Sequence, residues 1–388
     1  MKISKMWFAT LLLVVFMAGC ADGLGQGGGG GAGAPTVSAT VPIISATGVC
    51  TNKQLTATFS EAMAPATIIS PATNVTVKET VSGTNVPGTV TIDSTNTIAT
   101  FSPTSLLTAG TQYTATITTG VTDLGGTPLA SNKEWTFTAG SGTCAAKPVL
   151  GIVDPFAIAS AAGISNTGAT TVNGDVVLEP TATCNGVPSP GCGGTAPIIN
   201  GTLVFSSATA TNVMTALQAV YNTITPAGLP GATVLGCGII GSGGGGGAGV
   251  GCAGNFTLPP GAYIAAIASI GVTGDLILDA QGDQNAVFVF QTNSSTVTTA
   301  PGAPGVPGSR ILLINGAQAS NVFWQVGSSA TIGTYSEFRG NILADTSITM
   351  NTGATSCGRL LAGAITTSGA FTFDTNTVSV PGTVPSCP

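Results

Sequence analysis

Two neighbouring stretches repeat each other: IGTYSEFRGNILA at 332–344 and MNTGATSCGRLLA at 350–362. When the two stretches are aligned at an offset of 18 residues, Gly340 matches Gly358. A shorter third repeat, AITTSGAFTFD, follows at 364–374. A period this short marks a solenoid, in which each coil buries apolar side chains only by stacking on its neighbours. Because these repeats are rich in Gly, Thr and β-branched residues, they predict β coils with three short faces and not paired helices.

The composition favours an all-β protein with an uncharged surface. Only 6% of the 388 residues are charged, 56 are Gly and 43% are hydrophobic, whereas disorder would combine low hydrophobicity with high net charge. The net charge is −6, and after Lys147 the only cations are Arg310, Arg339 and Arg359. Nucleic-acid binding needs clustered Lys and Arg to neutralise phosphates, so we expect no nucleic-acid partner.

Catalytic and metal-binding patterns are missing from the sequence. It contains no His, which is the commonest general base and the commonest metal ligand, and no CxxC pair. Asp275, Asp279 and Asp283 are close in sequence, but Asp279 and Asp283 flank a turn-like Gln-Gly and are interpreted as turn caps. We therefore expect no enzyme, no metal site and no cofactor.

The N-terminus has the pattern of an exported lipoprotein. Lys2 and Lys5 precede a short apolar run, and Met17-Ala-Gly-Cys20 resembles a bacterial lipobox, so residues 1–20 are interpreted as a lipoprotein signal peptide with Cys20 as the lipidated residue. A plain secretory signal with an unpaired Cys20 is the alternative. Residues 21–40 are Gly-rich and predict a flexible tether.

Residues 41–146 predict a β-sandwich, because turn residues separate short strands at close intervals. The expected strands are Gln54–Phe59, Val75–Glu79, Thr89–Ile92, Thr97–Phe101, Gln112–Thr118 and Glu134–Thr138. LTATFSEAM at 55–63, ATFSP at 99–103, YTATI at 113–117 and WTFT at 135–138 resemble the bacterial Ig-like domain of surface proteins (SbsA type). Glu61 and Asp123 are interpreted as turn carboxylates and not as a site.

Residues 148–388 predict the solenoid, and one helix is expected within it at about Ser207–Thr225. Its apolar stripe consists of Val213, Leu217, Val220 and Tyr221, at the spacing of one helix face. Such a helix would pack along the side of the coils. The sequence Asn-Thr-Gly-Ala-Thr occurs at 166–170 and again at 351–355.

Eight cysteines follow Cys20, and their even number in an exported chain indicates disulfides. Proximity in sequence suggests three local pairs, and Cys50 and Cys144, which flank the β-sandwich, form the fourth, although proximity alone does not decide the connectivity. The pairs are Cys50 with Cys144, Cys184 with Cys192, Cys237 with Cys252, and Cys357 with Cys387.

From Ala157 onward the chain resembles a bacterial and fungal family of ice-binding proteins, the DUF3494 type. The segments that carry the resemblance are SNTGAT at 165–170, LILDAQGDQNAVFVFQ at 276–291, NGAQASNVFWQVGSSA at 315–330 and NTGAT with GRLL at 351–361. The resemblance implies an irregular right-handed β-helix with a helix alongside, and ice binding on one flat face rich in threonine.

In several members of that family a T-[AG]-x-[TN] pattern marks the ice-binding face. TGAT at 167–170 and at 352–355 fits the pattern, whereas TYSE at 334–337 departs from it and TATN at 209–212 falls at the start of the expected helix. The candidate ice-binding residues are Thr167, Thr170, Thr334, Ser336, Thr352, Thr355 and Thr367. The alternative interpretation is that these threonines are present because Thr is a favourable strand residue, with no role in binding.

The resemblance implies an ice-binding, antifreeze-type surface protein that inhibits ice growth or recrystallisation. With lipid at Cys20 and an Ig-like spacer, it would be a monomer at the cell surface or outer membrane that also attaches the cell to ice. A cleaved, soluble form is an alternative. The second functional hypothesis is a non-ice surface adhesin or carbohydrate-binding solenoid, which would need aromatic platforms. Phe323 and Trp324 are interpreted as core residues instead.

Overall fold

The computed structural model describes residues 33–71, 73–224, 229, 231–244, 249–265, 269–292, 294–383 and 387. The expected signal peptide and residues 21–32 of the expected tether lie outside this set. Strand β1 (Val37–Val41) begins inside the segment expected as tether, so ordered structure starts earlier than the Gly-rich composition suggested. Within the described residues, no helix has both the length and the apolar character needed to cross a membrane.

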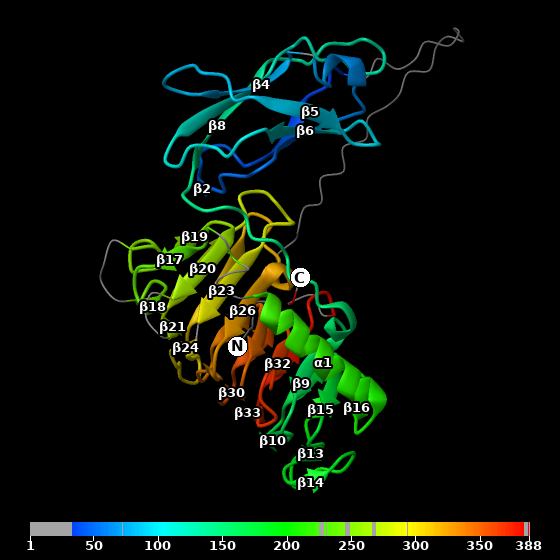
Figure 1. Ribbon diagram of the computed structural model, residues 1–388, viewed down its shortest axis with the longest axis vertical. Helices are drawn as coiled ribbons and strands as arrows, with labels where there is room; N and C mark the ends of the chain where they lie inside the picture. The colour runs from blue at the N-terminus through cyan, green and yellow to red at the C-terminus, as the bar shows by residue number, and fades with distance from the viewer. Residues whose placement is uncertain are drawn as a thin grey trace, which may run out of the picture. The chain divides into compact units, whose positions relative to one another are not determined.

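The first region is a β-sandwich of two four-stranded sheets, in the orders β1-β3-β6-β5 and β2-β8-β7-β4 (Figure 1). The six expected strands are present, and β1 and β2 are additional. The bounds of β2–β8 are Ala46–Val49, Leu55–Phe59, Val75–Glu79, Gly88–Ile92, Ile98–Pro103, Gln112–Ile117 and Lys133–Ala139, and a short 3-10 helix, η1, spans Pro65–Thr67. Alternate residues such as Tyr113, Trp135 and Phe137 fill the space between the sheets.

Asp123 is a turn carboxylate, as expected. Its Oδ1 accepts a hydrogen bond from the backbone N–H of Thr127 at 2.8 Å, and this bond lowers the pKa of the carboxyl from its ordinary value. The disulfide Cys50–Cys144 joins the two ends of this region.

The second region is a solenoid of three sheets, which we number in the order the chain enters them. Sheet 1 contains β9 (Phe156–Ser160), β12 (Asp175–Leu178), β16 (Leu203–Phe205), β17 (Thr233–Leu235), β20 (Gly261–Ala265), β23 (Phe288–Thr292), β26 (Val322–Val326), β29 (Asn341–Ala344) and β32 (Leu360–Ala362). Sheet 2 contains β10 (Ile164–Thr167), β13 (Thr183–Cys184), β14 (Val187–Pro188), β18 (Ile239–Ile240), β21 (Ile270–Val272), β24 (Val297–Thr299), β27 (Ala330–Ile332), β30 (Ile348–Met350) and β33 (Phe371–Asp374). Sheet 3 contains β11 (Thr171–Asn173), β15 (Ile198–Ile199), β19 (Thr257–Leu258), β22 (Asp275–Asp279), β25 (Arg310–Ile314), β28 (Glu337–Arg339), β31 (Thr355–Cys357) and β34 (Thr377–Ser379).

The 18-residue repeat is confirmed as one coil lying on the next. Ala330 pairs with Ile348 in sheet 2, Glu337 with Thr355 in sheet 3, and Leu343 with Leu361 in sheet 1. The strands of neighbouring coils are parallel in all three sheets. Side chains that point inward from the three sheets form a single core.

Aromatic rings stack through the middle of that core. Trp324 lies on Phe290 with ring centroids 3.9 Å apart, and Tyr263 and Phe338 continue the stack on either side. Phe323 and Trp324 are both fully buried, which confirms that they are core residues and leaves no exposed platform for a sugar at this point.

The chain does not build the solenoid from one end to the other. Its first coil, β9, β10 and β11, lies inside the stack; the chain then proceeds to one end at β16 and continues from the opposite end at β17. The last coil, β32–β34, then hydrogen-bonds to the first coil, β9–β11, in all three sheets. We call this junction the closure seam.

Helix α1 (Ala208–Thr223) connects the two ends and covers sheet 1 (Figure 1). The side chain of Ser207 caps its N-terminus by accepting a hydrogen bond from the backbone N–H of Ala210. The expected stripe, Val213, Leu217, Val220 and Tyr221, is buried against outward residues of sheet 1. Its 16 residues extend about 24 Å, which matches roughly five coils at 4.8 Å each.

Arg359 holds the closure seam. Its side chain is 6% exposed. Nε donates to the carbonyl of Asp154 at 2.6 Å and a terminal nitrogen donates to Asn341 Oδ1 at 3.0 Å. A second terminal nitrogen pairs with the carboxylate of Asp154 at 2.9 Å. Burial lowers the pKa of the guanidinium from its ordinary value, and the charge of Asp154 acts in the opposite direction. The short 3-10 helix η2 (Gly151–Val153) delivers Asp154 to this position, and another, η4 (Ala319–Asn321), precedes β26.

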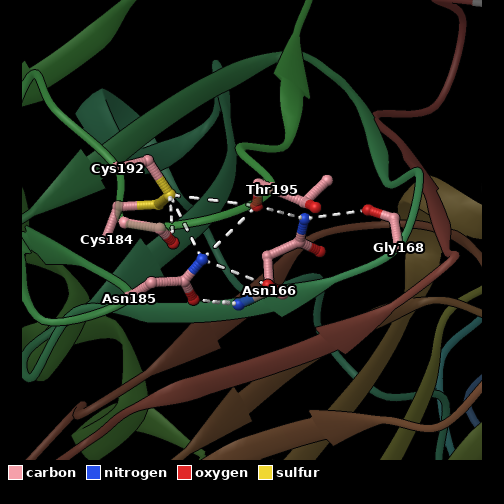
Figure 2. The surroundings of a disulfide bond; sticks show 7 residues. Asn166, Gly168, Cys184, Asn185, Cys192 and Thr195 are labelled. Atoms are coloured by element: carbon pink, nitrogen blue, oxygen red, sulfur yellow. Dashed lines mark hydrogen bonds between the residues drawn. A yellow bond between two sulfur atoms is a disulfide. The ribbon is translucent and has the colours of Figure 1, made fainter.

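The repeated Asn-Thr-Gly-Ala-Thr is the corner between sheets 2 and 3. Gly168 and Gly353 have φ values of +73° and +70°, a left-handed conformation that favours glycine. The Asn166 side chain donates to the carbonyls of Gly168 and Thr195 at 3.1 and 3.0 Å (Figure 2). Figure 2 also shows Asn185, which follows Cys184 of the Cys184–Cys192 disulfide and hydrogen-bonds to the backbone of Asn166.

In the stack of coils, the corner that contains Asn376 lies between the two Asn-Thr-Gly-Ala-Thr corners. Asn376 is 1% exposed. Its side chain donates to the carbonyls of Asn351 and Ala354 at 2.8 and 3.1 Å, and its backbone N–H donates to Thr170 Oγ1 at 3.1 Å. Asparagine thus satisfies the backbone groups of buried corners that the sheets leave unpaired. All four disulfides predicted from proximity are present in the structure.

We predict that Arg359→Met lowers the free energy of unfolding of the solenoid by about 1–3 kcal/mol, because the carbonyl of Asp154 loses its guanidinium donor and Asn341 Oδ1 keeps only the backbone N–H of residue 359. Arg310→Met is the matched control, since its ion pair with Asp275 is partly exposed and such pairs contribute about 1 kcal/mol or less. Urea unfolding of both variants measures the difference. Equal losses would contradict a special role for Arg359.

We also predict that Asn376→Ala destabilises the solenoid by about 1–3 kcal/mol, because the buried carbonyl of Ala354 loses its side-chain donor and the carbonyl of Asn351 keeps only the backbone N–H of Ala354. Asn200→Ala is the control: its side chain is exposed and, among the residues that the structure describes, hydrogen-bonds only to Asn173. The melting temperatures of the two variants, measured by thermal unfolding, test this difference in stability. An unchanged melting temperature for Asn376→Ala would show that the corner does not depend on this amide.

Candidate functional site

The outer surface of sheet 2 carries a column of hydroxyl side chains, one from each successive coil. Strand pairing places the members side by side, and we call the set the threonine column. Its members, in stacking order, are Ser165, Thr372, Thr349, Thr331 and Thr298, and Gly271 follows.

The alternation of each strand turns this column outward. In the central coils the residues on either side of the threonine are buried, as Ile348 and Met350 are around Thr349. Thr298 and Thr372 are exposed, and Thr331 and Thr349 are half-buried between their neighbours. The spacing within the column is about 4.8 Å, because it equals the separation of adjacent strands.

A second column runs beside the first, two residues earlier on each strand. We call it the serine column, and it consists of Ser269, Thr296, Ser329 and Ser347, with Ala370 at its end. Its hydroxyls are partly used within the protein: Ser329 Oγ accepts from the N–H of Ser347, and Ser347 Oγ accepts from the N–H of Ala370. All members are small, so the surface between the columns has no long side chain.

The hydroxyls of the threonine column differ from those of the serine column because they are free. Within the described part of the chain, Thr298, Thr331, Thr349 and Thr372 form no side-chain hydrogen bond. Among the described strands of sheet 2, the single charged residue is Asp374 at the end of β33. Its carboxylate accepts a hydrogen bond from Thr352 Oγ1 at 2.5 Å, at the corner.

The chemistry of this surface is that of a rigid, uncharged and regularly spaced array. Thr has a stiff χ1 angle, so little rotamer entropy is lost when the surface docks on another ordered array. Each residue presents a methyl group and a hydroxyl, which allows apolar contact and hydrogen bonding together. Many weak contacts on such a grid add up only if the partner is also periodic.

Three of the residues expected to bind ice lie at the corner that borders the threonine column. Thr167 is exposed at the end of β10, with its hydroxyl 3.3 Å from the carbonyl of Phe373. Thr334 donates to the carbonyl of Gly302 at 2.9 Å, and Thr352 donates to Asp374. Their hydroxyls therefore already have partners, unlike those of the column itself.

Two of the expected residues are buried and cannot contact ice, which contradicts their prediction as ice-binding residues. Thr170 is fully buried and its hydroxyl accepts the N–H of Asn376. Ser336 is 1% exposed, and its hydroxyl accepts from Thr299 and donates to the carbonyl of Ala300. Both side chains satisfy buried polar groups at the corner.

The remaining two expected residues lie elsewhere. Thr355 is exposed on sheet 3, where it pairs with Thr377 and Glu337. Thr367 lies in the loop between β32 and β33, beside a small hollow lined by α1 residues such as Met214. The expected set is thus spread over a corner, a second sheet and a loop, and does not form one face.

Sequence reasoning missed the threonine column, although one signal was present. At the 18-residue offset Thr331 falls on Thr349, each between two apolar residues. An apolar-Thr-apolar triplet repeated at the coil period indicates an outward threonine. The T-[AG]-x-[TN] pattern instead predicted residues at the corners between sheets 2 and 3.

Sheet 3 offers a contrasting outer surface. Its corresponding column begins as Thr171, Thr377 and Thr355 and continues as Glu337, Arg310 and Asp275. Arg310 forms two hydrogen bonds to the Asp275 carboxylate at 2.8 and 2.7 Å. These bonds raise the pKa of Arg310 above its ordinary value, and the nearby charge of Glu337 acts in the same direction. We call Asp275, Arg310 and Glu337 the charged column.

A sugar site and an enzyme site find no support in this geometry. The described strands of sheet 2 carry no outward aromatic residue, and Tyr335 in a corner turn lies over Gly353. Asp279 and Asp283 each accept a backbone N–H two residues ahead at 2.8 Å, which confirms that they are turn caps. No group of three potential metal-ligating His, Cys, Asp or Glu side chains occurs in the part of the chain that the structure describes.

Comparison with known proteins agrees with the two regions of the fold. Residues 158–379 match the model of the family described as ice-binding-like, and residues 32–139 match that of a bacterial Ig-like domain. An ice-binding protein of Nostoc sp. (strain HG1) is 36% identical over 232 residues, which are 60% of this chain and 73% of that protein. An ice-binding protein of Flavobacterium frigoris (strain PS1) is 34% identical over 131 residues, which are 34% of this chain and 42% of that protein.

Among solved structures, an ice binding protein from an Antarctic biological consortium is 35% identical with a TM-score of 0.50. The likeness covers 61% of this chain and 92% of that one. The family match spans more than half of the chain and agrees with the prediction that the chain is not an enzyme. The chain therefore belongs to the family of ice-binding-like proteins.

Proposed function

We propose that this protein binds ice through the outer surface of sheet 2, with the threonine column as the main contact and the serine column beside it. Adsorption of this kind restrains the growth or recrystallisation of ice crystals. The relatives described above carry the name ice-binding protein, and they match the solenoid region that forms this surface. The corner residues Thr167, Thr334 and Thr352 form the border of the proposed surface.

The observation that carries the proposal is the row of stacked, free threonine hydroxyls on a surface with almost no charge. Ice presents a periodic array of donors and acceptors and no charge to attract, so a binding surface gains from regular spacing and weak hydration. Lys or Glu would hold water strongly and would lose more side-chain entropy on docking. The central part of sheet 2 contains neither.

We predict that the double variant Thr331→Tyr/Thr349→Tyr loses most ice adsorption, by roughly tenfold or more, equivalent to about 1.4 kcal/mol. Two bulky rings in the middle of the column would lift the surface from a flat crystal plane. Partition of the labelled full chain into a slowly growing ice shell measures the loss. Circular dichroism and the melting temperature check that the solenoid stays folded.

The matched control is Thr355→Tyr/Thr377→Tyr, which places the same two rings on neighbouring coils of sheet 3. We expect this variant to adsorb like the unmodified protein. Full adsorption by the sheet 2 variant, or an equal loss in both variants, would show that sheet 2 is not the contact surface.

We also propose that the chain is exported, lipidated at Cys20 and held at the cell surface as a monomer, with the Ig-like region as a spacer that lets it attach the cell to ice. Support comes from the basic residues and apolar run that precede Met17-Ala-Gly-Cys20 and from the Gly-rich stretch that follows. The four disulfides fit an oxidising compartment.

Cys20→Ser is expected to move the protein from the membrane fraction to the soluble fraction of a bacterial host, and to abolish incorporation of labelled fatty acid. The other eight cysteines are paired, so the substitution leaves the disulfides intact. Membrane association that persists in Cys20→Ser would contradict lipid anchoring.

A further inference from the structure

Sheet 3 has the same geometry as the proposed ice-binding surface, and half of its outer column has the same chemistry. Thr171, Thr377 and Thr355 stack on consecutive coils, at the spacing found in the threonine column. Thr355 and Thr377 are exposed. Backbone geometry alone therefore does not explain why one sheet and not the other would adsorb.

The difference between the two surfaces begins at the coil of Glu337. Glu337 pairs with Thr355 on one side and Arg310 on the other, and Arg310 pairs with Asp275. The carboxylate of Glu337 is exposed, and the side chains of Arg310 and Asp275 are 38% and 29% exposed. On the equivalent coils, sheet 2 presents Thr331, Thr298 and Gly271.

We propose that the charged column is a specificity determinant. It confines ice adsorption to sheet 2, because it keeps the outer surface of sheet 3 hydrated and prevents it from adsorbing to ice. This inference rests on the proposed function. Ionised side chains bind water strongly and are costly to desolvate, so a crystal plane that offers no counter-charge is rejected by this column. While sheet 2 is docked, the same hydrated charges would oppose the growth of ice around the molecule.

A second feature of sheet 3 works in the same direction. Cys357 lies on the outer face of sheet 3, and its disulfide holds Cys387 over the column beside the charged one. Cys387 is 1% exposed in this position. Because Cys387 interrupts the flat area, and Arg339 and Asp279 remain on the strands of sheet 3, adsorption by sheet 3 without its charged column should be weaker than adsorption by sheet 2.

The test replaces the charged column by threonine: Asp275→Thr/Arg310→Thr/Glu337→Thr in the full chain. The change continues the column of Thr171, Thr377 and Thr355 without altering the strands, and loss of a partly exposed ion pair should affect the fold little. The triple variant is combined with Thr331→Tyr/Thr349→Tyr, so that sheet 2 is blocked. The fluorescently labelled proteins are adsorbed to a single-crystal ice hemisphere.

We expect the blocked protein to leave the hemisphere nearly dark, and the combined variant to label it at least about threefold more strongly than the blocked protein, equivalent to about 0.7 kcal/mol of recovered affinity. In the presence of an unblocked sheet 2, the triple variant should label planes in addition to those of the unmodified protein. The charge-preserving control Asp275→Glu/Arg310→Lys/Glu337→Asp should show neither gain.

A folded combined variant that leaves the ice dark would overturn the inference, and so would an equal gain in the charge-preserving control. These results differ from failure of the proposed function. If the unmodified protein itself does not label ice, or if Thr331→Tyr/Thr349→Tyr labels it fully, the sheet 2 surface is wrong irrespective of the charged column.

Discussion

Parallel hydrogen bonding from coil to coil is the constraint on which this structure depends. Each strand of a coil pairs in register with the equivalent strand of the next, so equivalent residues lie above one another about 4.8 Å apart. One side-chain choice, repeated in successive coils, then becomes a column. The aromatic stack around Trp324, the threonine column and the charged column all arise in this way.

The register must be held by more than the coils themselves, because the chain builds the solenoid in two parts. The first coil meets the last at the closure seam, where a buried Arg359 links Asp154 and Asn341 across the junction. Helix α1 covers sheet 1, which leaves sheets 2 and 3 as the outer surfaces. The corner asparagines satisfy backbone groups that no strand reaches. Rigid corners and a covered sheet thus support one flat, exposed sheet.

Much of the fold could be predicted from the sequence because its causes are local. The 18-residue offset, the apolar stripe of α1 and three of the cysteine pairs each involve short distances along the chain, and Cys50–Cys144, 94 residues apart, joins the two cysteines that remain. The contact surface could not be predicted in the same way. The offsets between neighbours in the threonine column are 18, 23 and 33 residues, since loops of different length separate the strands.

The first coil adds a further difficulty, because Ser165 joins the column beside Thr372, at the far end of the sequence. Only the three-dimensional register brings these residues together. The TGAT pattern was conspicuous for another reason: a corner needs glycine at a left-handed φ and small polar residues that hydrogen-bond to the backbone. Thr170 shows the consequence, since it fits the pattern and is fully buried.

We propose that a flat, uncharged hydroxyl array on the solenoid recognises ice as a periodic solid. Ice-plane affinity of the unmodified, fluorescently labelled full chain on a single-crystal hemisphere tests it most directly. Labelled patches with sharp boundaries are expected on defined crystal planes, because a rigid grid fits few plane spacings. A clean hemisphere from folded protein with its disulfides intact would contradict the claim and would leave the family likeness as one of fold.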